Sequence, residues 1–137
     1  EDNYDENVTQ AYHKGLDAIV KCQVKVNGKL TSWCAQHDEV TLEPAQARSY
    51  ELPSLSGSES VAILEFLMSM KNPGPEIKTA IFAGCEWFEN SKINGQRLVR
   101  IMDPKYERGY DQVLKPDPEA PPISSTVQVR VARIQIL

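Results

Sequence analysis

Residues 56–70 read SGSESVAILEFLMSM, and this stretch decides the fold that we expect. Its first residues fit a capping box, in which Ser56 and Glu59 bind each other's free backbone amides at the start of a helix. Apolar residues follow at once and lie on most sides of that helix, which is typical of a core element. They are Val61, Ile63, Leu64, Phe66, Leu67, Met68 and Met70.

A second helical pattern follows directly. Residues 72–75 (NPGP) interrupt the first helix, and Pro75 suits the first turn of a new one that ends near Asn94-Gly95. Its apolar stripe comprises Ile77, Ile81, Phe82, Cys85, Trp87 and Phe88. We therefore expect two adjacent helices that pack against each other.

Upstream, helical spacing over residues 7–23 predicts a further helix, with Asp5 or Asn7 as its cap. Asn27-Gly28 is a tight-turn signal and predicts a short hairpin after it. Three helices of similar length favour helix-on-helix packing. The predicted fold class is all-α, a partial α/α toroid with irregular loops.

The C-terminal third has weaker signals. Residues 98–101 are apolar enough for a short strand, whereas the prolines after residue 102 predict an extended, irregular segment up to residue 122. Residues 127–137 alternate apolar and polar side chains and predict a short C-terminal strand. We expect one partial domain over residues 1–137.

Composition narrows the function classes. The chain has 137 residues and a net charge of −4, which gives no reason to expect nucleic acid as a partner. It contains no run of 18 apolar residues, so we expect no membrane span. Three cysteines without CxxC spacing make a structural zinc site improbable. Three buried thiols are favoured over one disulfide with a free thiol.

Residues 33–51 read WCAQHDEVTLEPAQARSYE and form a polar connection between helical patterns. The stretch holds a Trp, a Cys, a His, an Arg and four carboxylates. Loops held by rigid elements are where binding and catalytic groups gather. This connection is therefore the candidate site.

At this loop the chain resembles the pectate lyases of polysaccharide lyase family ten. The matching strings are residues 31–38 (TSWCAQHD), 41–45 (TLEPA), 47–48 (AR), 50–54 (YELPS) and 56–60 (SGSES), with flanking agreement at 15–19, 66–69, 87–88 and 92–95. The resemblance covers residues 7–122 and departs over residues 123–137. It indicates the C-terminal portion of such an enzyme.

The resemblance implies an α/α toroid that cleaves polygalacturonate, the backbone of pectin, by calcium-assisted β-elimination. A base removes the proton at C5, beside a uronate carboxylate that calcium and Arg neutralise. It also implies a secreted or periplasmic protein. The family's calcium-binding carboxylates lie upstream of the matching loop, so we expect the calcium ligands outside this chain and assign no metal ligand here.

Arg48 best matches the family's catalytic base. Because a guanidinium is effectively always protonated, Arg48 could instead stabilise the developing enolate charge. A purely structural alternative is that Arg48 pairs with Glu43 or Glu51 and braces the loop.

The predicted substrate-binding residues are Trp33, Gln36, His37, Asp38 and Glu51. Trp33 either stacks on a sugar or anchors the loop to the core, and His37 with Asp38 either supplies acid–base chemistry or forms a hydrogen-bonded pair that fixes the loop. The chain lacks a nucleophile elbow, so a hydrolase triad has little support.

Departure from the family pattern after residue 122 indicates a truncation, a frameshift or a chimeric join. Two alternatives to an active lyase therefore remain open. One is a non-catalytic remnant that binds uronate or another carbohydrate, and the other is a helical domain that binds a protein.

Overall fold

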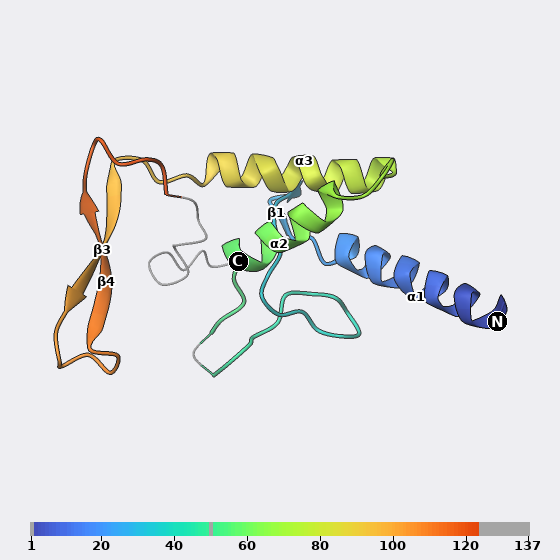
Figure 1. Cartoon of the computed structure of the whole chain (residues 1–137), viewed down its shortest axis with the longest axis horizontal. Helices are drawn as coiled ribbons and strands as arrows, with labels where there is room; N and C mark the ends of the chain where they lie inside the picture. Colours follow the sequence, from blue (N-terminus) through green and yellow to red (C-terminus); the bar gives the residue numbers. More distant parts are fainter. Residues whose placement is uncertain (1, 50, 124–137) are drawn as a thin grey trace.

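The computed structural model describes residues 2–49 and 51–123, with side chains from residue 5 onward. In Figure 1, three helices gather around a small hairpin, and a second hairpin stands beyond the end of the third helix. In chain order the elements are α1 (Asp2–Lys21), β1 (Lys25–Val26), β2 (Lys29–Leu30), α2 (Gly57–Met68), α3 (Pro75–Asn90), β3 (Gln96–Met102) and β4 (Tyr110–Pro116).

The core lies where α2 meets α3. Its buried members are Trp33, Leu64, Leu67 and Ala80, and partly buried residues of α1 and α3 pack around them, including Leu16, Ile19, Ile77, Ile81 and Phe88. A Cβ atom at Gly84 would lie 2.9 Å from Leu64 Cδ2, so glycine allows α3 to approach α2 closely. The expected core helix is confirmed, although Phe66 and Met68 on its other side are exposed.

The predicted capping box was wrong in detail. The Ser56 hydroxyl bonds directly to the Glu59 carboxylate, and the Ser56 side chain makes no bond to the backbone of α2. The Ser56 and Glu59 side chains therefore hydrogen-bond to each other rather than to the free backbone amides at the start of α2. Pro75 does occupy the first turn of α3, where its missing N–H leaves no intrahelical bond unmade.

The hairpin predicted at Asn27-Gly28 is confirmed, since β1 and β2 pair in antiparallel fashion around these residues. Both have positive φ angles, 51° and 78°, as a tight hairpin turn requires. Gln23 Nε2 donates to the carbonyl oxygens of Thr31 and Ala80, each at 2.9 Å. This buried amide fastens the hairpin to α3.

The all-α prediction was wrong. β3 and β4 form a seven-pair antiparallel ladder from Gln96↔Pro116 to Met102↔Tyr110, so the structure contains two separate two-stranded sheets besides its helices and is not an all-α toroid. Proline had indicated an irregular segment here. Pro104 instead lies in the turn and Pro116 ends its strand, positions where a missing N–H does no harm. The strand predicted at 127–137 lies outside the described residues.

Candidate functional site

Trp33 fixes the start of the polar loop to the helical core. Its side chain is only 1% exposed, and its indole N–H donates to the Ile19 carbonyl at 2.7 Å. Its backbone N–H donates to Ser60 Oγ at 3.0 Å, while its carbonyl accepts from the Ser56 amide at 2.8 Å. A ring enclosed in this way cannot stack on a sugar, so Trp33 is the loop's anchor.

The loop then doubles back on itself through backbone hydrogen bonds. The Asp38 amide donates to the Glu43 carbonyl at 2.9 Å, and the Ala45 amide donates to the Gln36 carbonyl at 3.0 Å. Leu42 takes a positive φ of 61° at the reversal. These bonds bring the residues after Trp33 beside those that precede Arg48.

His37 and Asp38 brace this reversal separately and do not form the expected pair. His37 Nδ1 lies 2.9 Å from the Leu42 carbonyl, and Nε2 accepts from the Cys34 amide at 3.3 Å, an arrangement that fits a ring protonated on Nδ1. Asp38 Oδ1 accepts from the amides of Val40 and Thr41. The Thr41 amide is the main reason that the pKa of Asp38 lies below its ordinary value.

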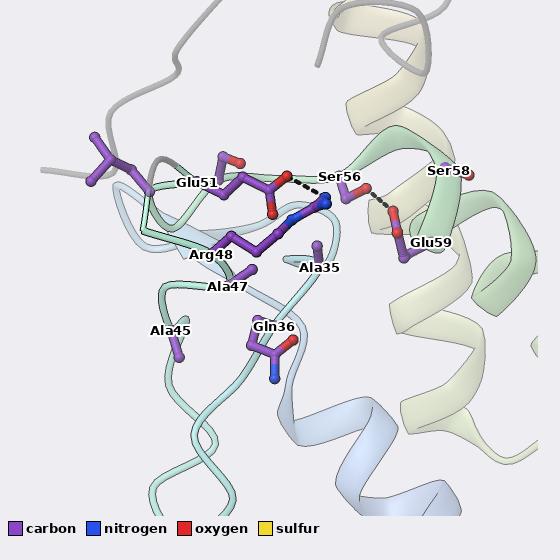
Figure 2. A pocket seen from close by; sticks show the side chains of 11 residues that line it. Ala35, Gln36, Ala45, Ala47, Arg48, Glu51, Ser56, Ser58 and Glu59 are labelled. Carbon is purple, nitrogen blue, oxygen red and sulfur yellow. Dashed lines mark hydrogen bonds and ion pairs between the residues drawn. The ribbon is translucent and has the colours of Figure 1, made fainter. Parts of the chain in front are cut away.

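A pocket of about 240 Å³ opens beside the second half of the loop. Its walls come from the loop and from the start of α2 (Figure 2). Three predicted residues, Gln36, Arg48 and Glu51, meet there, whereas Trp33, His37 and Asp38 do not line it. The other lining residues are Ala35, Ala45, Ala47, Leu52, Ser54, Ser56, Ser58 and Glu59.

Arg48 is the lone cation among the residues that line this pocket. Its Nη2 atom lies 2.5 Å from Glu51 Oε1, and its side chain remains 70% exposed. The hydrogen bond from Arg48 holds the pKa of Glu51 below its usual range. Of the two partners proposed for Arg48, Glu51 is the one in contact. Gln46 Nε2 supports the turn by donating to the Arg48 carbonyl at 3.2 Å.

Glu59 was interpreted as a helix cap, yet its carboxylate lines the pocket and accepts the Ser56 hydroxyl (Figure 2). The pocket therefore carries one guanidinium and two carboxylates. Sequence reasoning missed the contributions of Ser54, Ser56 and Ser58. Their signal was the run of small polar residues that precedes the apolar stretch of α2.

The described part of the chain contains no group of three or more His, Cys, Asp or Glu side chains that could hold a metal ion. Calcium prefers six to eight oxygen ligands, and the described carboxylates are not clustered closely enough to form such a site. All three cysteines are free, but the prediction that all are buried was wrong, because Cys22 is half-buried and Cys85 is exposed. Burial raises the pKa of the Cys34 thiol to about 11, which leaves it protonated and a poor nucleophile at neutral pH.

No helix in the described ranges is long and apolar enough to cross a membrane.

Comparison with known proteins gives a consistent result. A family model described as pectic acid lyase matches residues 1–123. Two similar solved structures are the family 10 polysaccharide lyase from Cellvibrio cellulosa and a point mutant of it in complex with trigalacturonic acid. Each is 38% identical, has a TM-score of 0.69 and aligns over 88% of this chain. This chain spans 36% of the length of each of the two solved lyase chains. A comparison with curated proteins found no match.

Proposed function

The chain belongs to the pectic acid lyase family, and from this premise we propose that it takes part in the cleavage of polygalacturonate by β-elimination, with Arg48 as its catalytic residue. One observation carries the proposal. Arg48 is the cation of a pocket formed by the family-like loop, and its guanidinium faces solvent there. A polyuronate carries one carboxylate on each sugar, and a guanidinium binds such a group through two parallel hydrogen bonds.

In the sugar chain, the reaction breaks the C5–H and C4–O bonds and forms a C4–C5 π bond. A base takes the proton at C5, the released electron pair forms the C4–C5 double bond, and the C4–O bond breaks. The departing oxygen keeps its electron pair and acquires a proton. Negative charge spreads onto the neighbouring carboxylate in the transition state. A cation already placed at that carboxylate lowers the barrier, because it needs no reorganisation when the charge appears.

We assign this charge-stabilising role to Arg48 rather than that of the base. The Glu51 carboxylate at 2.5 Å stabilises the charged guanidinium, whereas a base would first have to lose a proton. Gln36 is positioned in the same pocket to contact a sugar hydroxyl. His37, Asp38 and Trp33 contribute by holding the loop through their hydrogen bonds.

Calcium dependence is part of the proposal. The described residues offer no suitable cluster of calcium ligands, so we propose that these ligands lie outside them. We also propose that the chain is part of a longer enzyme, since it spans only 36% of the chains of its structural relatives. A polymer too large to enter a cell is attacked outside the cytoplasm, which supports a secreted or periplasmic enzyme.

The test measures ultraviolet absorbance of unsaturated products from polygalacturonate, first with calcium and then with a chelator. We expect calcium-dependent product from the longer enzyme that contains this chain, and Arg48→Ala in that enzyme should lower the rate about 10²–10³-fold. Arg100→Ala, which removes an arginine in β3, is the matched control and should retain full activity.

Arg48→Lys separates the two roles of Arg48. A lysine that stabilises charge should leave a reduced rate with an unchanged pH profile. A lysine that replaces a base should give a rate that rises until about pH 10. Absence of product, together with uronate binding that depends on Arg48, would favour the non-catalytic remnant. Absence of both product and uronate binding would contradict the proposal.

A further inference from the structure

The charge of the pocket does not suit an anionic ligand at first sight. Its lining holds Glu51 and Glu59 besides Arg48, so carboxylates outnumber cations there. The Ser56 hydroxyl already engages Glu59. Glu51 is different, because its carboxylate contacts the guanidinium on which uronate recognition rests.

Backbone geometry sets this contact. The Glu51 amide donates to the Arg48 carbonyl at 2.8 Å and closes a tight turn between the two residues. Gln46 Nε2 caps the same turn through the carbonyls of Arg48 and Ser49. With its main chain fixed and 35% of its side chain exposed, Glu51 presents its carboxylate to Arg48 at the edge of the pocket (Figure 2).

We infer that Glu51 is an internal competitor for Arg48, whose carboxylate occupies the place of a substrate carboxylate until uronate arrives and so sets the affinity for uronate. The inference rests on the proposed function. The side chain of Glu51 and a uronate present the same functional group to the same guanidinium. Binding is therefore an exchange of one carboxylate for another at Arg48.

Two consequences follow from this exchange. Without substrate, Glu51 holds the charged guanidinium of Arg48 at the pocket, which prepares it for uronate. With substrate, loss of the Arg48–Glu51 contact lowers the affinity. Exposed ion pairs contribute modestly, so the reduction amounts to about two- to five-fold. Ligands without a carboxylate have nothing to exchange and leave the internal pair in place.

The experiment measures the affinity of the chain for trigalacturonic acid by isothermal titration calorimetry. Glu51→Gln keeps the shape of the side chain and the backbone bond to Arg48 but removes the competing charge. We expect it to bind about two- to five-fold more tightly than the wild type. Glu43→Gln removes the same charge from an exposed site on the same loop and should change affinity less than two-fold.

The outcomes separate this inference from the proposed function. Wild-type binding that Arg48→Ala abolishes and Glu51→Gln leaves unchanged or weaker would overturn the inference alone. Equal tightening by Glu43→Gln would also overturn it, because the effect would then reflect net charge. Absence of binding by both the wild type and Glu51→Gln would overturn both. Glu51→Asp, which keeps the charge but shortens its reach, should give an intermediate affinity and guards against misfolding of the first variant.

Discussion

The polar loop over residues 33–51 and the β3–β4 hairpin differ in how firmly each is attached to the helical core, and their backbone patterns alone do not reveal this difference. The loop has almost no regular structure, yet the buried Trp33 ties it to the helical core by hydrogen bonds to the buried Ser60 and to the partly buried Ile19 carbonyl. The hairpin has a regular ladder, but within residues 2–49 and 51–123 its strands pair only with each other, and they stand apart from the three helices (Figure 1). Regular pairing is therefore no measure of how firmly a segment is held.

The pocket lies in the firmly held region. A pocket needs side chains that stay in place, and the loop obtains this from attachment to the core at Trp33 and at the start of α2. A two-stranded hairpin without a covering layer is marginal in water. Met102 at its far end is 71% exposed. The candidate site accordingly lies on irregular backbone rather than on the regular hairpin.

The largest expected difference between the two regions is in stability. Trp33→Ala removes a fully enclosed ring together with its bond to the Ile19 carbonyl, so it should lower the free energy of unfolding by about 3–5 kcal/mol. Met102→Ala, the matched truncation in the hairpin, should change it by about 0.5 kcal/mol or less. Urea denaturation of both variants measures this difference. Equal losses would mean that the loop is no better anchored than the hairpin.

A smaller difference concerns two aspartates, one in each region. The pKa of Asp38 is lowered mainly by the Thr41 amide, and that of Asp103 mainly by a hydrogen bond from the Lys105 side chain. A lowered folded-state pKa stabilises the protein above the ordinary value of 3.8, and this contribution is lost as the pH falls through the folded-state value.

Salt should separate these two aspartates, because it screens the exposed lysine more than it affects a backbone amide. Carbon-13 NMR titration of both carboxyl groups, in low and in high salt, measures the effect. Both pKa values should lie below 3.8 in low salt. Only that of Asp103 should rise in high salt. A similar rise at Asp38 would show that its backbone bonds are weaker than the structure indicates.

Local signals made part of this fold predictable. Apolar spacing together with Pro75 located α2 and α3, and Asn27-Gly28 located the first hairpin, because each depends on neighbours in the sequence. β4 was missed because the prolines around it were interpreted as interruptions, although Pro104 lies in the turn before β4 and Pro116 at its end, positions that tolerate proline. Whether a proline breaks a strand depends on what pairs beside it, which is a tertiary property.

The site was predictable to a similar degree. Arg48 was predicted as the catalytic residue from the family resemblance, and the structure places it in the pocket. Its contact with Glu51 was one of the two anticipated pairs. Burial of Trp33 and the separate partners of His37 could not be read from the sequence, since they depend on how the loop meets α1 and α2. The sequence alone does not distinguish polar residues that hold the loop in place from polar residues that bind a ligand.

Titration of isotope-labelled protein with trigalacturonic acid, followed by amide chemical shifts in NMR, tests the central claim most directly. We predict that the amide shifts of the residues that line the pocket change on titration and that Arg48→Ala removes these changes. Those residues are Ala35, Gln36, Ala45, Ala47, Arg48, Glu51, Leu52, Ser54, Ser56, Ser58 and Glu59. Changes confined to residues 96–116, or loop changes that persist in Arg48→Ala, would contradict the assignment of uronate recognition to this pocket.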